Sequence, residues 1–174
     1  MTPLEQNARD LELELEWLAR LIDTRFKHYF ASTAPGAGRP ADLAAVPPPD
    51  LTGSTSPYAA FLRHYELPLP DRVAVALALS PHVRPQALDL FTTKNPTFDR
   101  RFVELGGARS GPDGDFLPTG ETLAFLLGGG DLATRFAVQR RYGPGHLLAR
   151  HDALRLSPLG DEPPMKAPLT RMMP

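Results

Sequence analysis

The chain has 174 residues, of which 42% are hydrophobic and 20 are proline, with a mean hydropathy of −0.24 and a net charge of −1. This length predicts one domain, or one small domain with appendages, and the near-neutral charge argues against a dedicated nucleic-acid binder. The absence of cysteine excludes disulfides, thiolate zinc sites and a thiol nucleophile. No apolar run approaches the length of about 18 residues that spans a membrane, and the acidic N-terminus has no signal-peptide core. A cytoplasmic location fits these features.

Residues 3–31 are predicted to form one long helix, because apolar residues recur every three or four positions along them. The apolar stripe consists of Leu11, Leu15, Leu18, Ile22, Phe26 and Tyr29, widened by Trp17 and Leu21. Residues 11–17 also alternate like a strand, but Leu and Glu favour helices and the spacing continues beyond this segment. Thr2 and Pro3 suit the helix start, and Glu5 suits its first turn. The row Glu12, Glu14 and Glu16 is interpreted as a solvated face, with an acidic docking surface as the alternative.

Residues 32–56 are predicted to be a linker, because Pro, Gly, Ala and Ser dominate them. The three prolines at 47–49 are interpreted as a spacer, because no flanking basic residue supports a polyproline ligand.

Three shorter helices are predicted next. The first covers residues 58–65 after Ser56-Pro57, the second covers residues 71–80 before Pro81, and the third begins at Pro85. A strand is the competing interpretation for residues 73–79, but the interleaved alanines favour a helix that is apolar on all sides and therefore buried.

Residues 92–107 are predicted to be irregular, and glycines mark turns on both sides of residue 110. Thr119 is expected to cap a helix over residues 120–127, which the glycines at 128–130 end. Asp131 is expected to cap a helix over residues 132–141.

The end of the chain is predicted to be less regular. Residues 147–148 and 154–156 are two short apolar segments that are expected to pair as a small hairpin. The tail from Ser157 is rich in proline and has no periodicity. The predicted organisation is a long helix (1–31), a linker (32–56), a helical domain (57–157) and a tail (158–174). The predicted fold class is mainly α with a small β-hairpin.

The segment 114–122 is weakly similar to a phosphate-binding loop. That motif needs four residues between its glycines and a lysine after them, whereas five residues separate Gly114 from Gly120 and Glu121 follows. Because a carboxylate repels phosphate, a capped helix start explains this segment better.

The polar residues outside that loop give weak catalytic signals. The histidines are His28, His64, His82, His146 and His151, and none has the helical spacing of a metal pair. Asp113 and Asp115 flank a turn glycine; a solvated loop is the default interpretation, and an acid pair in a small hydrolase is a third-ranked alternative.

Arginines make the late segment locally basic, namely Arg135, Arg140, Arg141, Arg150 and Arg155. Short helices followed by a hairpin fit a winged helix, whose helix 132–141 would enter the major groove of DNA. A winged-helix nucleic-acid-binding module is therefore the alternative function, although the chain as a whole is slightly acidic.

Several segments together resemble the N-terminal, winged-helix-like domain of an AAA-type ATPase that accompanies phage-tail-like contractile injection systems. These segments are RVAVALALSP at 72–81, VRP at 83–85, LD at 88–89, FTTKN at 91–95, ELGG at 104–107, FLPTGET at 116–122 and FLL at 125–127. LEWL at 15–18 and EPP at 162–164 are also similar, so the resemblance covers most of the chain except residues 32–56.

The resemblance implies a non-catalytic domain that recognises a substrate or adaptor, or regulates an ATPase, during assembly or remodelling of an injection particle. A protein component of that particle would be the partner, and the ring of the parent ATPase would be a route to homo-oligomers. ATP and Mg would bind to an ATPase module beyond residues 158–174, so we expect no cofactor, no catalytic residue and no metal in this chain. Neither nucleic acid nor a membrane is an expected partner.

The matched polar residues have two possible roles. They are Arg84, Asp89, Lys94, Asn95, Glu104 and Glu121. We favour a buried polar network that fixes the irregular middle of the chain, because buried charges need partners. The alternative is a recognition surface for the particle component.

Overall fold

The computed structural model describes residues 2–31, 45–109, 114–143, 145–158, 160–161 and 163–171. Within these ranges the chain is mainly helical, and its strands form short antiparallel pairs. The helices and 3₁₀ turns are α1 (Pro3–Ala31), α2 (Pro57–His64), α3 (Leu69–Val83), η2 (Pro85–Thr92), η3 (Val103–Leu105), α4 (Gly120–Gly128), α5 (Leu132–Arg141), α6 (Leu147–Arg150) and η4 (Pro164–Lys166). The predicted fold class and the long N-terminal helix are confirmed.

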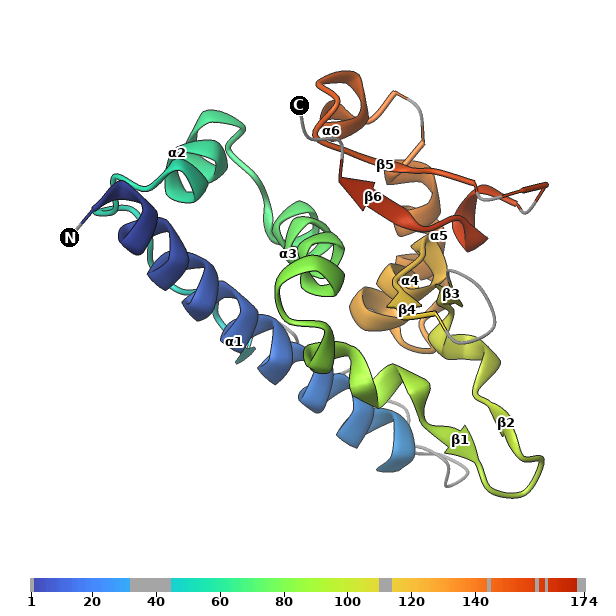
Figure 1. The fold of residues 1–174 in the computed structure, drawn as a ribbon. Coiled ribbons are helices and arrows are strands. Elements are labelled where there is room, and N and C mark those ends of the chain that lie inside the picture. Colours follow the sequence, from blue (N-terminus) through green and yellow to red (C-terminus); the bar gives the residue numbers. More distant parts are fainter. Residues whose placement is uncertain are drawn as a thin grey trace.

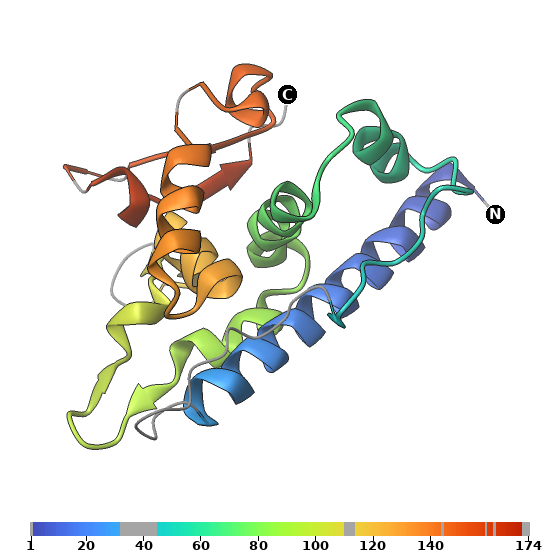
Figure 2. The same cartoon turned by 180° about the vertical axis from the view of Figure 1, so that it is seen from behind.

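α1 runs along one side of the molecule, with α2 and α3 packed over it (Figures 1 and 2). It begins with a reciprocal cap, in which the Glu5 amide donates to Thr2 Oγ1 (3.2 Å) and the Thr2 amide donates to Glu5 Oε2 (2.8 Å). The predicted apolar stripe faces the core. The prediction of a solvated glutamate row is wrong at Glu14, which is 1% exposed, because Arg72 of α3 lies opposite it.

α3 is the buried centre of the molecule, as its apolar character predicts. Val73, Ala74 and Leu77 have no exposed surface, and α3 packs between α1 and α4. The helix extends past the predicted end at Ser80, because Pro81 lies in its last turn and the Arg84 amide still donates to the Ser80 carbonyl (2.9 Å). The next segment, η2, is a 3₁₀ helix that begins at the predicted residue.

Aromatic rings join α1, η2 and α4 beneath α3. Phe26 lies edge-on to Phe91 (5.2 Å between ring centroids) and to Phe125 (5.5 Å). This core also includes Leu154 and Leu169 near the end of the chain. The predicted regions 1–31, 57–157 and 158–174 therefore contribute to one hydrophobic core.

The later part of the predicted linker is packed against the helices. Residues 32–44 of that linker lie outside the described residues. Further along, Leu51 and Ser56 are buried, and the indole nitrogen of Trp17 donates to the Val46 carbonyl (2.8 Å). Arg72 holds the same segment, because its guanidinium donates to the Pro49 carbonyl (2.9 Å) as well as to both carboxylate oxygens of Glu14 (2.6 Å each).

The strand pairs are β1 (Lys94–Asn95) with β2 (Arg100–Arg101), β3 (Ala108–Arg109) with β4 (Phe116–Leu117), and β5 (Leu154–Leu156) with β6 (Leu169–Arg171). The predicted hairpin between residues 147–148 and 154–156 is wrong, because residues 147–150 form α6 and β5 pairs with β6. The aperiodic tail is therefore packed against the domain: Ala167 is buried, and Leu169 of β6 is part of the hydrophobic core. In the described part of the chain, no helix is both long and apolar enough to cross a membrane.

Thr119 caps α4 as predicted. Its hydroxyl accepts from the amides of Thr122 (3.4 Å) and Gly107 (3.1 Å), and its own amide donates to Thr122 Oγ1 (3.0 Å). Gly107 has a φ of 90°, and a Cβ there would lie 2.0 Å from the Phe116 ring, so only glycine fits. One hydroxyl thus joins the start of α4 to the turn before β3.

Replacing Thr119 by alanine is expected to lower the free energy of unfolding by about 1.5 kcal/mol, because a helix cap and a loop hydrogen bond are both lost. Urea unfolding followed by circular dichroism measures this change. Thr119→Ser is the matched control. It keeps the hydroxyl, so its free energy of unfolding should stay close to that of the parent chain. Equal losses in the two variants would contradict the capping account.

Candidate binding site

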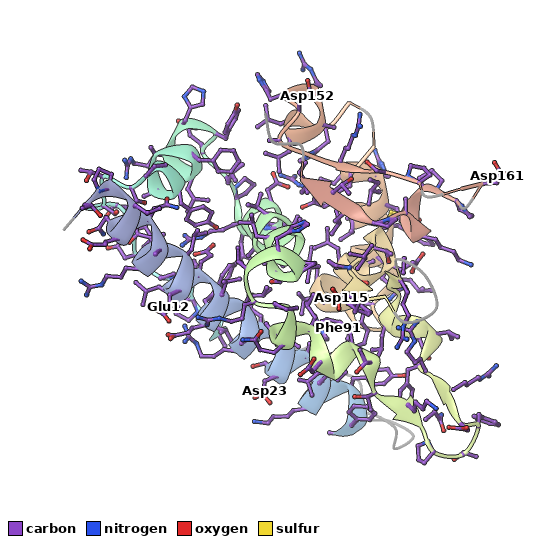
Figure 3. All side chains as sticks on the ribbon, viewed as in Figure 1. Glu12, Asp23, Phe91, Asp115, Asp152 and Asp161 are labelled. Atoms are coloured by element: carbon purple, nitrogen blue, oxygen red, sulfur yellow. The ribbon has the colours of Figure 1, made fainter. Side chains whose placement is uncertain are left out.

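An apolar cavity of about 440 Å³ lies among α1, α2, α3 and the turn between α6 and β5. Figure 1 shows α2 and α6 on opposite sides of one end of α3, and Figure 3 marks Asp152 at the turn after α6. The lining residues are Asn7, Leu11, Pro57, Tyr58, Phe61, Tyr65, Val75, Ala78, Leu79, His151, Asp152, Ala153 and Leu154. We call this site the α2–α6 cavity.

The α2 side of the cavity is fixed by a buried carboxylate on α1. Asp10, which is 2% exposed, accepts hydrogen bonds from Ser54 Oγ and from Ser56 Oγ (2.6 Å). The Ser56 hydroxyl also caps α2 by accepting from the Ala59 amide (3.0 Å), and Asn7 Oδ1 accepts from the amide of Tyr58 (2.8 Å). These bonds set where α2 begins relative to α1. They thereby position the aromatic wall of the cavity, which consists of Tyr58, Phe61 and Tyr65.

The α6 side is fixed by Asp71 of α3, which is 1% exposed. Arg141 donates to both carboxylate oxygens (2.8 and 2.6 Å), the Tyr142 hydroxyl donates to Oδ1 (2.8 Å), and His146 Nε2 lies 3.2 Å from Oδ1. Burial alone would raise the pKa of Asp71, but the hydrogen bonds from Arg141 and Tyr142 and the nearby positive charges outweigh burial and lower it. The four residues, called here the Asp71 cluster, join α3 to the end of α5 and the start of α6.

His146 is held as a neutral ring in this cluster. Its Nδ1 accepts from the Leu148 amide (3.3 Å) and caps α6, so the ring hydrogen is on Nε2 and points to Asp71. Burial lowers the pKa of His146, and the Arg141 charge acts in the same direction, against the attraction of Asp71. A proton on Nδ1 would remove the cap.

The stability of the chain is therefore expected to depend on pH near neutrality. The folded pKa of His146 lies below the ordinary value of about 6.5, so its contribution is complete above that value and is lost as the pH falls toward the folded pKa. Denaturant unfolding between about pH 7.5 and 5.5 measures the loss.

A His146→Asn variant keeps a capping oxygen but has no titrating ring, so it should lose less stability on acidification than the parent chain. His82→Asn changes an exposed histidine and is the matched control, which should behave as the parent does. The account of His146 would be contradicted if both variants retained the full pH dependence.

Two helix ends meet at the mouth of the cavity. α2 ends at Tyr65, where the Leu67 amide donates to the Leu62 carbonyl (3.2 Å); α6 ends at His151, where the Ala153 amide donates to the Leu148 carbonyl (2.8 Å). The rings of Tyr65 and His151 lie 5.3 Å apart. The residue after each ring adopts a positive φ, 46° at Glu66 and 52° at Asp152, which reverses the chain beside the opening.

The six polar residues singled out by the resemblance do not form one buried network. None of them is buried. Arg84 lies between α3 and η2, and the others lie on η2, β1, η3 and α4. Arg84 pairs with Glu12 (3.2 Å), and Lys94 pairs with Asp99 (3.0 Å). The interpretation as one buried network is wrong, because none of the six is buried and these two ion pairs are separate from each other.

The remaining members of that set also make separate contacts. Asn95 Oδ1 accepts from the Thr97 amide (2.9 Å), Glu104 lies beside Tyr29, whose pKa burial and this carboxylate raise, and Asp89 is exposed. Glu121 pairs with Arg135 of α5 (2.8 Å). The interpretation of this set as a recognition surface stays a prediction.

The other candidate sites have structural explanations where the structure describes them. Asp113 lies outside the described residues. Among the described residues, no group of three or more His, Cys, Asp or Glu side chains is placed to hold a metal ion. Two of the late arginines are in internal pairs, Arg141 with Asp71 and Arg135 with Glu121, whereas Arg140 is exposed. The outer face of α5 also carries Leu132 (64% exposed) and Phe136 (57% exposed), which cannot form hydrogen bonds to base edges.

No local sequence pattern indicates the α2–α6 cavity. The helix that carries its aromatic residues was predicted, but His151 and Asp152 line the cavity from more than 80 positions later in the chain. Asp71 is the one signal that the sequence contains for this region. An acidic residue at the start of an otherwise apolar, buried helix must have polar partners.

Comparisons with protein-family models, with curated proteins and with solved structures found no match to this chain.

Proposed function

We propose that this chain is a non-catalytic protein-recognition domain that binds its partner at the α2–α6 cavity. We further propose that it is the winged-helix-like N-terminal domain of an AAA-type ATPase, with a component of a contractile injection particle as its partner. The observation that carries the first proposal is the open apolar cavity itself. Its volume of about 440 Å³ lies in the range of ligand sites, and fixed helices position its aromatic wall.

The ATPase assignment rests on the sequence resemblance. Most of the matched segments are in the scaffold: RVAVALALSP forms the buried α3, ELGG supplies the turn before β3, and FLPTGET forms β4 and the cap of α4. These segments would identify a shared fold. They do not determine which partner binds, because most residues that line the cavity come from outside these segments.

Binding of purified particle components to the immobilised chain tests the proposal. We expect saturable binding that is reduced at least about tenfold by Val75→Trp, because a large ring on the cavity floor would displace an anchor side chain. Val103→Trp, at a position that is 75% exposed, is the matched control and should bind normally. If Val75→Trp fails to fold, Ala153→Trp fills the cavity from the α6 side.

Calorimetry with Mg-ATP should detect no saturable binding to this chain, because the only loop resembling a phosphate site is used as a helix cap and places Glu121 beside it. Saturable nucleotide binding would contradict the proposed non-catalytic role. A salt-dependent shift of DNA that Arg140→Ala weakens would instead support the winged-helix nucleic-acid module.

A further inference from the structure

We infer that the α2–α6 cavity selects protein segments in which an apolar anchor stands next to a lysine or arginine. The anchor would fill the cavity, and the neighbouring cation would lie at its mouth beside Asp152. This inference rests on the proposed protein-recognition function and specifies the chemistry of the partner.

The floor of the cavity is suited to an apolar anchor. Leu11, Val75, Leu79 and Leu154 line it together with Phe61, and all five come from elements that the core or the Asp10 and Asp71 contacts hold in place. A pre-formed apolar pocket of this kind binds an aliphatic or aromatic side chain with little ordering of its own residues.

The charge at the mouth is negative. Asp152 is the only carboxylate among the lining residues, and it is exposed. In the part of the chain that the structure describes, no ion pair joins it to a basic residue. Its carboxylate is therefore available to a partner cation.

The arginine of α2 does not cancel this charge. Arg63 is turned toward the preceding loop, where its Nη1 donates to the Ser54 carbonyl (2.7 Å). Arg150 stands in the last turn of α6 but is not among the lining residues.

Aromatic rings favour the same sign of charge in a partner. Tyr65 and His151 stand at the mouth, 5.3 Å apart, and the face of a tyrosine ring attracts a guanidinium or ammonium group. Tyr65 is also the C-terminal cap of α2, and the carbonyl end of a helix carries partial negative charge. Carboxylate, ring and helix end thus act together on one ligand group.

Two fluorescein-labelled peptides test this inference. Both have glycine and serine flanks; one has the centre Phe-Arg-Leu, and the other has Phe-Glu-Leu. Fluorescence anisotropy should show the arginine peptide binding at least about fivefold more tightly at low salt, and the difference should shrink as salt is added.

Asp152→Asn should reduce the preference to less than about twofold, because it removes the charge, and asparagine tolerates the positive φ of 52° at this position. Asp89→Asn, at an exposed aspartate outside the cavity, is the matched control and should keep the preference. Val75→Trp should weaken both peptides.

Equal binding of the two peptides, or a preference that survives in Asp152→Asn, would overturn the inference. Binding of neither peptide would also overturn it. If the parent chain still bound particle components and Val75→Trp did not, the proposed function would stand without this partner chemistry; if particle components also failed to bind, both would fall.

Discussion

Replacing Asp71 by asparagine is expected to lower the free energy of unfolding by about 3 kcal/mol. The carboxylate is buried and accepts from Arg141 and Tyr142 while facing His146, so the amide would leave the arginine without its counter-charge and turn an NH₂ group toward a donor. Arg141 keeps 39% of its side chain exposed, and this partial solvation places the expected loss at the lower end for a broken pair.

Urea unfolding of Asp71→Asn measures this loss, with Asp89→Asn as the control. Asp89 is exposed, so its substitution should change stability by less than about 0.5 kcal/mol. Because the Asp71 cluster positions α6, hydrogen exchange in residues 147–153 should also rise in Asp71→Asn. A loss below about 1 kcal/mol would contradict the role assigned to this cluster.

Replacing Arg25 by methionine is expected to lower the free energy of unfolding by about 3 kcal/mol. Arg25 is 2% exposed and donates to the carbonyls of Leu126 (2.8 Å) and Leu127 (2.9 Å), where α4 ends. Methionine would fill much of the space but leave two helix-terminal carbonyls without these donors. No carboxylate pairs with Arg25 within the described ranges. The partial negative charge at the end of α4 partly offsets the cost of burying the positive charge of Arg25.

Arg20→Met is the matched control, because Arg20 lies on the exposed side of the same helix and methionine has a similar helix propensity. Its free energy of unfolding should be within about 0.5 kcal/mol of that of the parent chain. A second variant, Gly129→Ala, probes the same contact: a Cβ there would lie 2.6 Å from Arg25 Nη1, and the φ of 53° adds strain. If Arg25→Met proved as stable as Arg20→Met, the buried guanidinium would not be holding the end of α4.

Local rules predicted the helices well. Residues 3–31 and 132–141 form helices with those bounds, and Thr119 and Asp131 cap α4 and α5 because short polar side chains at these positions satisfy the first free amides. The fold class followed from the helical periodicity of the apolar residues.

Long-range partners could not be predicted in the same way. Asp71 and Arg141 are 70 positions apart, and Arg25 and Leu126 are 101 positions apart. Nothing in the local pattern distinguishes a buried arginine from an exposed one on a helix that carries both. The hairpin prediction was wrong for the same reason. β5 pairs with a strand from the proline-rich tail, and no periodicity marks that strand.

The central claim is that the chain recognises a protein through the α2–α6 cavity. Site-specific photo-crosslinking tests it most directly, with benzoylphenylalanine placed in turn at Phe61 in the cavity, at Phe98 (63% exposed) and at Phe136 (57% exposed). The experiment uses cells that contain the natural protein and the injection particle proposed as its partner. The account predicts that a particle protein is captured from Phe61 and from neither of the other two positions. Capture from Phe98 or Phe136 with none from Phe61, or capture of nucleic acid, would contradict it.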